Sequence, residues 1–497
     1  MADNGSRYTL LVAFFIPFFI TSCAVGPDYD RPIVVVPPQF KEAKQQKWVK
    51  NKEWHPINPI DAQNKGEWWR VFNDPILNDL EAQLIAYNQN VGASEATYRQ
   101  SLAFVDQARS GFFPTLTGAF SLFRQKQGGG TSSLINTSDG TTTTNVVTSG
   151  TTLARAPTTT NFSSVLYATW EPDVWGLVRR TIEASQATAQ SNAALVAATR
   201  LSAQGSLAQY YFELRTLDLN QQLLNKTVTA YQNIVTFTQN QYTAGIVSQA
   251  DVVLAKSQLD TAQAQVLNNG ILRGQYEHAI AVLIGRPPAF LYLKSNPLKL
   301  KVPLIPLEIP SLWLERRPDV AAAERLVQNR SALIGVAVAA FYPSITLTGS
   351  ATASARSLSK LINTPVLGWS TGLQIAETFF DGGYRSAGVR AARAAYDAQV
   401  ALYRQTTLTA FQDVEDNLIA LRLLKEQSRV QNRAAANAQL ALKLITNQYK
   451  AGTVAFNNVI QSQILAFNAQ KTANDINGLQ MTAAVGLIKA MGGGWNI

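Results

Sequence analysis

The chain has 497 residues, of which 46% are hydrophobic and only 15% are charged, and its formal net charge is +10. The Lys and Arg residues are scattered along the chain, whereas a nucleic-acid-binding protein clusters them on one face. One cysteine and two histidines exclude an intrachain disulfide and a Cys/His zinc cluster, and they argue against a His-based catalytic set. We therefore predict neither an enzyme nor a metal site.

The N-terminus begins with a signal for export. Thr9–Ile20 is an apolar run that is too short to cross a membrane as a helix, and it fits the hydrophobic region of a secretory signal peptide. The run ends in the tetrapeptide ITSC, which resembles a bacterial lipobox and contains the only cysteine of the chain, Cys23. We predict a signal peptide at 1–22 and lipid attachment at Cys23, the alternative being a buried free cysteine.

The next segment, residues 23–75, contains prolines and tryptophans but shows no helical or strand periodicity, so we expect a lipidated, extended segment. Ala24 follows the cysteine directly. An Asp at that position tends to retain bacterial lipoproteins at the inner membrane, so Ala24 implies sorting to the outer membrane.

A first repeat unit is expected at 76–284. A helix at 77–110 leads into two strands, about 112–124 and 161–172, whose apolar residues alternate with polar ones. The stretch between the strands is rich in Gly, Ser and Thr, which indicates a long loop. Two long helical patterns follow and are separated by a turn at 244–247.

A second repeat unit, 318–497, follows a Pro-rich connector at 285–317 and has the same order of elements. Its strands are expected at about 342–353 and 366–378, and its long helices flank a turn at 451–454. The turns read QYTAG and QYKAG, and the offset from Gly245 to Gly452 is 207 residues (452 − 245). Glycine tolerates the left-handed conformation that ends many helices, so both turns are expected to close helical hairpins.

The fold class is mostly α with membrane β-hairpins, built from a duplicated helix-strand-strand-helix-helix unit. Strands of about ten residues have the length that crosses a membrane in a tilted orientation. Four strands cannot close a barrel, and open sheet edges are not tolerated in lipid. Several chains must therefore share one barrel.

Several motifs, in this order, resemble the TolC-like outer membrane efflux factors, and in particular their NodT-type lipoproteins. They are GPDYDRP at 26–32, RRPDVAAAE at 316–324, FYPSITLTG at 341–349, FDGG at 380–383, FQDVEDNL at 411–418 and the two QYxAG turns. The resemblance covers essentially the whole mature chain. It implies a homotrimer with a 12-stranded β-barrel in the outer membrane, joined to a long α-helical barrel in the periplasm.

The same resemblance implies a passive exit duct for small toxic compounds or drugs. An inner-membrane pump of the resistance-nodulation type would feed it through a periplasmic membrane-fusion adaptor, with no nucleic acid and no cofactor beyond the lipid on Cys23. The adaptor would contact the hairpin tips, which are Ala244, Gly245, Ile246, Val247, Ala451, Gly452, Thr453 and Val454.

Family members close the periplasmic aperture with carboxylates six and nine residues after the turn glycine. Asp251 matches this pattern, whereas Asn458 and Gln461 depart from it, so strong cation binding is not expected. The alternative for Asp251 is a first-turn residue that the helix dipole favours. The acidic residues of FQDVEDNL do not share one helix face, so we expect a structural role that joins the hairpins rather than a metal site.

Two other functions remain open at this level. One is a duct for type I protein secretion, and the other is a structural envelope lipoprotein without a pore. Aromatic residues near the strand ends predict either interfacial girdles or core packing; they are Phe112, Phe113, Trp170, Trp175, Phe341, Tyr342, Phe379 and Phe380.

Overall fold

The structure, a computed structural model, describes residues 24–38, 40–42, 66–126, 158–297, 302–303 and 316–493. The expected signal peptide, Cys23 and most of the expected loop between the first two strands lie outside these residues. The chain divides into two compact units that each draw on both sequence repeats. The first unit comprises Met1–Pro27, Asp106–Ile182 and Leu333–Ala391, and the second comprises Asp28–Val105, Glu183–Ala332 and Ala392–Ile497.

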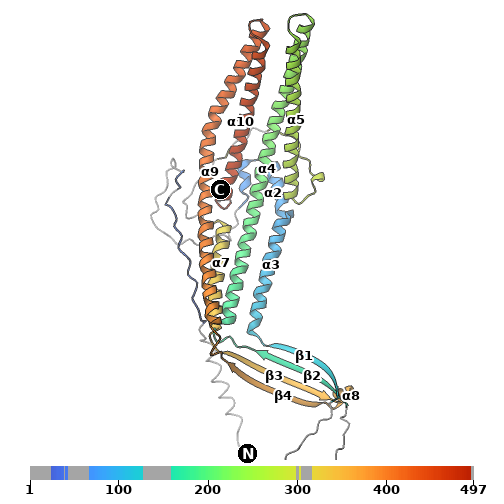
Figure 1. Cartoon of the computed structure of the whole chain (residues 1–497), viewed down its shortest axis with the longest axis vertical. Coiled ribbons are helices and arrows are strands. Elements are labelled where there is room, and N and C mark those ends of the chain that lie inside the picture. The colour runs from blue at the N-terminus through green and yellow to red at the C-terminus, as the bar shows by residue number, and fades with distance from the viewer. Residues whose placement is uncertain are drawn as a thin grey trace, which may run out of the picture. The chain divides into compact units, whose positions relative to one another are not determined.

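The first unit contains an antiparallel four-stranded sheet with the strand order β1-β2-β3-β4 (Figure 1). The strands are β1 (Thr115–Lys126), β2 (Thr158–Trp170), β3 (Ser344–Ala355) and β4 (Val366–Ala376). A short helix, α8 (Leu358–Asn363), connects β3 to β4. Among the described strands, β1 and β4 each pair on one side only, so both edges of the sheet are open within the chain.

The two faces of this sheet differ in polarity because side chains alternate along each strand. The register aligns Gly118 with Leu166, Leu166 with Ala351, and Ala351 with Trp369, which places these residues in one row on one face. This face is apolar and open, as the exposed fractions of Leu116 (66%), Phe120 (60%) and Trp369 (81%) show. The other face carries hydroxyl groups, including a Ser350–Ser370 pair with 2.9 Å between the Oγ atoms.

The junctions between strands and helices are fixed by arginines at matching positions of the two repeats. Arg179 donates to Asp173 at 2.9 Å, and Arg385, 206 residues later (385 − 179), donates to Asp381 at 2.7 Å. Hydrogen bonds from the Arg385 side chain and then from backbone N–H groups lower the pKa of Asp381 to about 2. The aspartate is therefore ionised and locks the turn that begins the long second-repeat helix.

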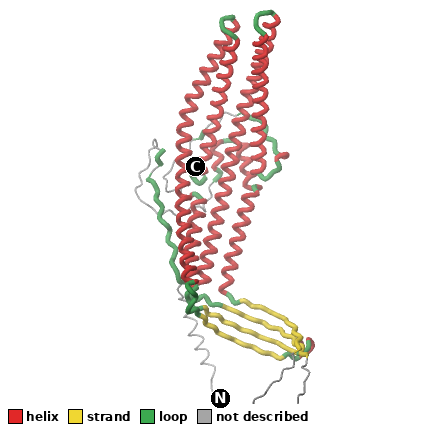
Figure 2. The backbone as a smooth tube through the Cα atoms, in the orientation of Figure 1, coloured by secondary structure: helices red, strands yellow, loops and turns green. Residues whose placement is uncertain are grey.

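The second unit is helical, and four of its helices also contribute residues to the first unit (Figures 1 and 2). The helices are α2 (Pro75–Tyr87), α3 (Gln89–Arg109), α4 (Leu177–Thr243), α5 (Gln249–Leu283), α7 (Pro318–Ala339), α9 (Tyr384–Lys450) and α10 (Phe456–Ala490), with 3-10 turns η2 (Trp68–Phe72) and η4 (Pro288–Phe290). A further 3-10 turn, η3 (Ser110–Phe112), belongs to the first unit. Within the described part of the chain, no helix combines the length and the apolar character needed to cross a bilayer.

The expectation of a single helix at 77–110 is wrong, because the segment breaks at Asn88. The Asn88 side chain accepts a hydrogen bond from the Val91 backbone N–H at 3.0 Å and donates one to the Leu283 carbonyl at 2.7 Å. It therefore begins α3 and attaches the break to the end of α5. Sequence also placed the first strand too early, since Ser110–Phe112 forms the 3-10 turn η3.

The N-terminal segment is only partly extended, because Trp68–Phe72 forms the 3-10 turn η2 and helix α2 already begins at Pro75. Before these, the described residues 28–38 and 40–42 form an N-terminal strap that lies against α7 and α9. The Tyr29 hydroxyl donates to the buried carboxylate of Glu324, and Tyr29 packs on the cluster around Val320, Val327 and Tyr403. The strap thus contributes to the core of the helical unit.

FQDVEDNL has the structural role that we expected. Its Val414 and Leu418 lie in the same buried core as residues of α4 and α5, so the motif packs the second hairpin against the first. Glu415 accepts the backbone N–H groups of Lys41 and Glu42 at 2.6 and 3.0 Å, which anchors the N-terminal strap to α9. Asp413 instead accepts from Arg317 at 3.0 Å, at the start of α7. The motif therefore attaches α9 to two other segments of the same unit.

The described start of the connector is held by a buried ionic network. Arg215 and Asp218, both with fully buried side chains, form an ion pair at 2.9 Å, and Arg273 joins Asp218 at 2.8 Å. Arg215 also donates to the Lys294 carbonyl at 3.0 Å, and Asp218 accepts the Asn296 N–H at 3.0 Å. Each buried charge thus has a charged or backbone partner, which burial of an ion requires.

Candidate functional site

The two hairpin turns have the same backbone geometry. After α4, the N–H of Ile246 bonds the Gln241 carbonyl and the N–H of Gly245 bonds the Tyr242 carbonyl, both at 2.9 Å. After α9, Thr453 bonds Gln448 at 3.0 Å and Gly452 bonds Tyr449 at 2.9 Å in the same pattern. This pair of bonds defines the Schellman motif, and it needs a left-handed residue at the position of the glycine. Gly245 and Gly452 supply it, with φ of 71° and 76°.

The turns present a small, mostly apolar surface. Six of the eight expected tip residues are exposed, and only Val247 and Val454 are half-buried. Ile246 is 70% exposed, so it adds one large apolar side chain to this surface. The tips are therefore accessible in the single chain.

The expected aperture residues lie just beyond the turns, where the return helices begin. Asp251 accepts the backbone N–H of Ser248 at 3.1 Å, and the Ser248 hydroxyl accepts the N–H of Asp251 at 3.3 Å. This reciprocal pair is a capping box, so Asp251 stabilises the start of α5. The second hairpin lacks that device, since its N-cap is Ala455 without a side-chain hydrogen bond. Asn458 and Gln461 are exposed on the first turns of α10.

Directly behind the tips, the hairpins share an apolar core and one side-chain hydrogen bond. The core contains buried residues of α4, α5 and α10: Tyr231, Val235, Ala255, Leu259, Ala262, Phe456, Val459 and Ile460. Tyr449 of α9 packs edge-on against Phe237 with 6.0 Å between ring centroids, and its hydroxyl donates to Gln241 Oε1 at 2.7 Å. Burial, followed by the charge of Asp251, raises the pKa of Tyr449, so the hydroxyl stays a donor at neutral pH.

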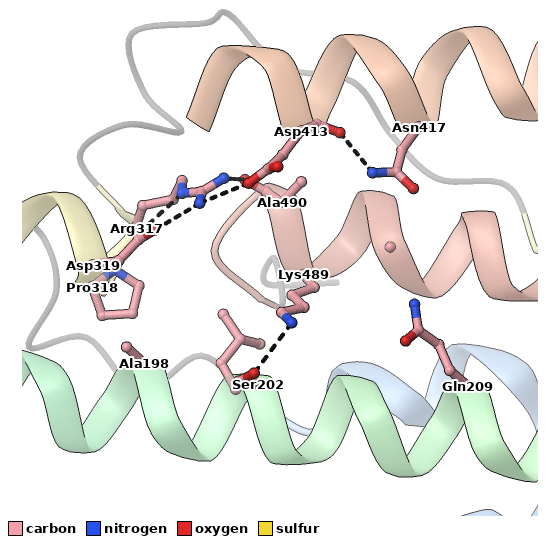
Figure 3. A pocket seen from close by; sticks show the side chains of 12 residues that line it. Ala198, Ser202, Gln209, Arg317, Pro318, Asp319, Asp413, Asn417, Lys489 and Ala490 are labelled. Carbon is pink, nitrogen blue, oxygen red and sulfur yellow. Dashed lines mark hydrogen bonds and ion pairs between the residues drawn. The ribbon is translucent and has the colours of Figure 1, made fainter. Parts of the chain in front are cut away.

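Farther along the same unit, Arg317 binds three segments together next to a cavity of about 440 Å³ (Figure 3). Its guanidinium contacts Asp319 at 2.6 Å and Asp413 at 3.0 Å, and it donates to the Ala490 carbonyl at 3.1 Å. Burial alone would raise the pKa of Asp319, but the hydrogen bonds from Arg317 outweigh it and lower this pKa. Arg317 therefore fastens the end of α10 to α7 and α9.

The tips consist of exposed turns joined by packing and one hydrogen bond, and they do not bring together side chains for covalent chemistry. Within the described ranges, no three His, Cys, Asp or Glu side chains come close enough to hold a metal ion. Sequence reasoning located the turns but missed the contact between Gln241 and Tyr449. The only signal for it was the repeated Gln-Tyr pair before each glycine, and that pair does not say which residue faces which.

Comparison with known proteins identifies the family. The family model described as "Outer membrane efflux protein" matches residues 80–286 and 309–493. The chain belongs to the outer membrane efflux protein family. The match includes both hairpins and all four strands, so it covers the tip surfaces as well as the sheet.

Individual relatives of this efflux protein agree with the assignment. It is 25% identical to the cation efflux system protein CusC of Escherichia coli O6:H1 over 488 residues, which cover 98% of each chain. It is 24% identical over 486 residues to a protein of Salmonella typhimurium named "Probable outer membrane lipoprotein SilC", covering 96% of this chain and 97% of that one. The solved outer-membrane channel OprN matches with a TM-score of 0.79 at 25% identity, over 95% of this chain and 100% of that chain.

The expected efflux role and outer membrane location are thereby confirmed: the chain is the outer membrane channel component of an efflux system. The expected TolC-like fold is also confirmed, as a mostly helical chain with a few antiparallel strands. Family members are channel proteins and not enzymes, which is consistent with the role expected from the sequence.

Proposed function

We propose that three copies of this chain form a passive exit duct, with twelve strands (three times four) closed into one membrane barrel and the helices of the second unit forming an α-helical barrel in the periplasm. The observation that carries the proposal is the sheet itself. It has an apolar exposed face, a hydroxyl-rich opposite face and two open edges. An open edge is not tolerated in lipid, and pairing β1 of one copy with β4 of the next removes every edge.

The polarity of the faces supports the same arrangement. In a membrane barrel, apolar side chains face lipid and polar side chains face the lumen. The face with Leu116, Phe120 and Trp369 is then outside, and the face with Ser350 and Ser370 lines the duct. The aromatic residues at the strand ends favour interfacial girdles over core packing, because Phe113, Phe379 and Phe380 are 70% to 95% exposed.

Engineered disulfides between the open edges test this arrangement. Each variant carries Ser370→Cys with one of Thr117→Cys, Ala119→Cys or Ser121→Cys, which scans the unknown register. Oxidation is expected to give a covalent trimer on denaturing gels for at least one pair. The control, Val165→Cys with Thr352→Cys, joins partners that already face each other in one chain and should give only monomers. The proposal fails if no edge pair yields a species larger than the control.

The remaining parts of the proposal concern the hairpin tips and the N-terminus. The exposed hairpin tips receive a periplasmic membrane-fusion adaptor, which couples the duct to a resistance-nodulation-type pump in the inner membrane. Asp251, Asn458 and Gln461 line the aperture, where Asp251 also serves as a helix cap. Cys23 carries the lipid anchor after removal of residues 1–22, and the relative named as a lipoprotein supports this. The pump selects the exported compounds, here small toxic molecules or drugs.

We further assign two repeat units, 76–284 and 318–497, separated by the connector 285–317 and preceded by the anchored segment 23–75. The equal lengths of α4 and α9, 67 residues each, and of α5 and α10, 35 residues each, support the duplication.

A further inference from the structure

The two ends of the β-sheet differ in charge. At the end where the strands meet the long helices, carboxylates and arginines are paired, as in Arg179–Asp173 and Arg385–Glu377. The other end carries four exposed cationic side chains: Arg124, Lys126, Arg356 and Lys360. The described residues around them, 121–126, 158–163 and 353–367, include no Asp or Glu.

The strand register places two of these cations at the border of the apolar face. Side chains two residues apart point to the same side of a strand, so Arg124 and Lys126 continue the row of Phe120 and Leu122. Their charged groups therefore lie at the border of the apolar face, at the end of β1. Four like charges at one end repel each other unless a negative partner is present.

Helix α8 and the residues just before it supply the other two cations and two apolar side chains at the same end (Figure 1). Leu358 and Ile362 are four residues apart, which places them on one helix face, and they are 50% and 75% exposed. Arg356 precedes both residues, Lys360 lies between them in the sequence, and both cations are exposed. A short segment that combines exposed apolar residues with exposed cations suits the boundary between acyl chains and headgroups.

We propose that Arg124, Lys126, Arg356 and Lys360, together with α8, bind the phosphate groups of a phosphorylated glycolipid in the outer leaflet. This inference rests on the proposed function, because the sheet must lie in the outer membrane. Arginine pairs with phosphate in a bidentate manner and lysine as a point charge, while Leu358 and Ile362 enter the acyl boundary beneath. The lipid phosphates supply the negative partner that the described chain lacks at this end.

The test uses the full-length protein in detergent and titrates it with fluorescently labelled lipopolysaccharide or with the same lipid after enzymatic dephosphorylation. The variant Arg124→Gln/Lys126→Gln/Arg356→Gln/Lys360→Gln removes the four charges. The matched control Lys256→Gln/Arg404→Gln/Arg433→Gln/Lys443→Gln removes four exposed cations from the helices. Each cation near an anionic surface contributes several-fold to affinity, so we expect the first variant to bind at least about tenfold more weakly.

The control should bind within about twofold of the unchanged protein, and dephosphorylation should weaken binding to the unchanged protein but not to the first variant. Equal affinities of the two variants, or indifference to dephosphorylation, would overturn the inference. The edge-cysteine pairs are introduced separately into the protein with its four cations intact, and trimer formation is measured in parallel. If the covalent trimer forms but lipid binding shows no phosphate preference, only the lipid site is rejected. If no edge-cysteine pair forms a covalent trimer, the proposed function itself is rejected.

Discussion

The hydroxyl of Tyr449 donates a 2.7 Å hydrogen bond to the side-chain carbonyl of Gln241, 208 residues earlier in the chain (449 − 241). This bond joins α9 to α4 close to the two turns, so it ties the tip of one hairpin to the tip of the other. The rings of Phe237 and Phe456 pack on Tyr449 from other helices. One substitution can therefore remove this link between the hairpins without disturbing the aromatic packing.

Tyr449→Phe is expected to loosen the tips. The variant keeps the aromatic contacts and loses one hydrogen bond, which contributes about 0.5–1.5 kcal/mol. A closed state that is weaker by this amount should raise the open fraction about two- to tenfold, measured as single-channel conductance in planar bilayers. Tyr396→Phe serves as the control, because Tyr396 is also half-buried on α9 and its hydroxyl makes no hydrogen bond to the described residues. Identical conductance traces for the two variants would contradict the role of the bond.

Gly452→Val should deform the second tip. The residue has φ of 76°, a conformation that costs a side-chain-bearing residue about 1–2 kcal/mol, and more for a β-branched one. We expect weaker cross-linking to the adaptor at the tip and lower drug resistance in cells. Gly388→Val is the matched control, because Gly388 lies in α9, has no positive φ, and an added Cβ there meets open space. Normal cross-linking and resistance with Gly452→Val would remove the tip from the docking role.

Lipid attachment at Cys23 predicts sensitivity to globomycin, which blocks cleavage of lipoprotein signal peptides. Treated cells should accumulate the uncleaved precursor, and Cys23→Ser should lose incorporation of labelled palmitate. The reason is that the thiol is the acceptor of the diacylglyceryl group in a lipobox. Unchanged processing under globomycin would refute the anchor while leaving the duct proposal intact.

Arg317→Met should destabilise the helical unit. The substitution removes the guanidinium donor from the carboxylates of Asp319 and Asp413 and from the carbonyls of Ala410 and Ala490, and it leaves Asp319 with the backbone N–H of Val320. The side chains of Asp319 and Asp413 are 38% and 45% exposed, so water replaces part of the lost interaction and the cost should be about 1–3 kcal/mol. The thermal midpoint should therefore fall by a few degrees, as circular dichroism at 222 nm would detect. The exposed Arg404→Met variant should unfold at the original temperature. An unchanged midpoint for Arg317→Met would show that the α10 end is held by packing alone.

Glu81→Leu should stabilise the protein in a pH-dependent manner. The Glu81 side chain is fully buried on α2, neither carboxylate oxygen has a hydrogen-bond partner among the described residues, and desolvation raises its pKa. A raised pKa in the folded state means that stability is highest below the unfolded pKa of about 4.3 and is lost as pH rises through the folded pKa. The gain from Glu81→Leu should therefore be small at pH 4 and about 1–3 kcal/mol at pH 8, measured by thermal unfolding. A gain that is equal at both pH values would exclude titration of Glu81 as its cause.

Local patterns were sufficient to predict the long helices, the strand faces and the turns. The two QYxAG stretches predicted hairpin ends, and the alternation at Leu116–Leu122 predicted the apolar face that the register shows. The break at Asn88 could not be predicted, because apolar spacing continues across it and its partner, the Leu283 carbonyl, is 195 residues away. The same applies to Tyr449 and Gln241 at the candidate site, since no local rule pairs side chains from different hairpins.

The matched hairpin lengths limit how this protein can diverge. Helices α4 and α9 have 67 residues each, and α5 and α10 have 35 each. Inserting one helical turn into a single hairpin would advance its end by about 5.4 Å and separate Tyr449 from Gln241. Tolerated insertions and deletions should therefore occur in both halves of the gene. The length of the proposed duct would then change only when both hairpins lengthen or shorten by the same amount.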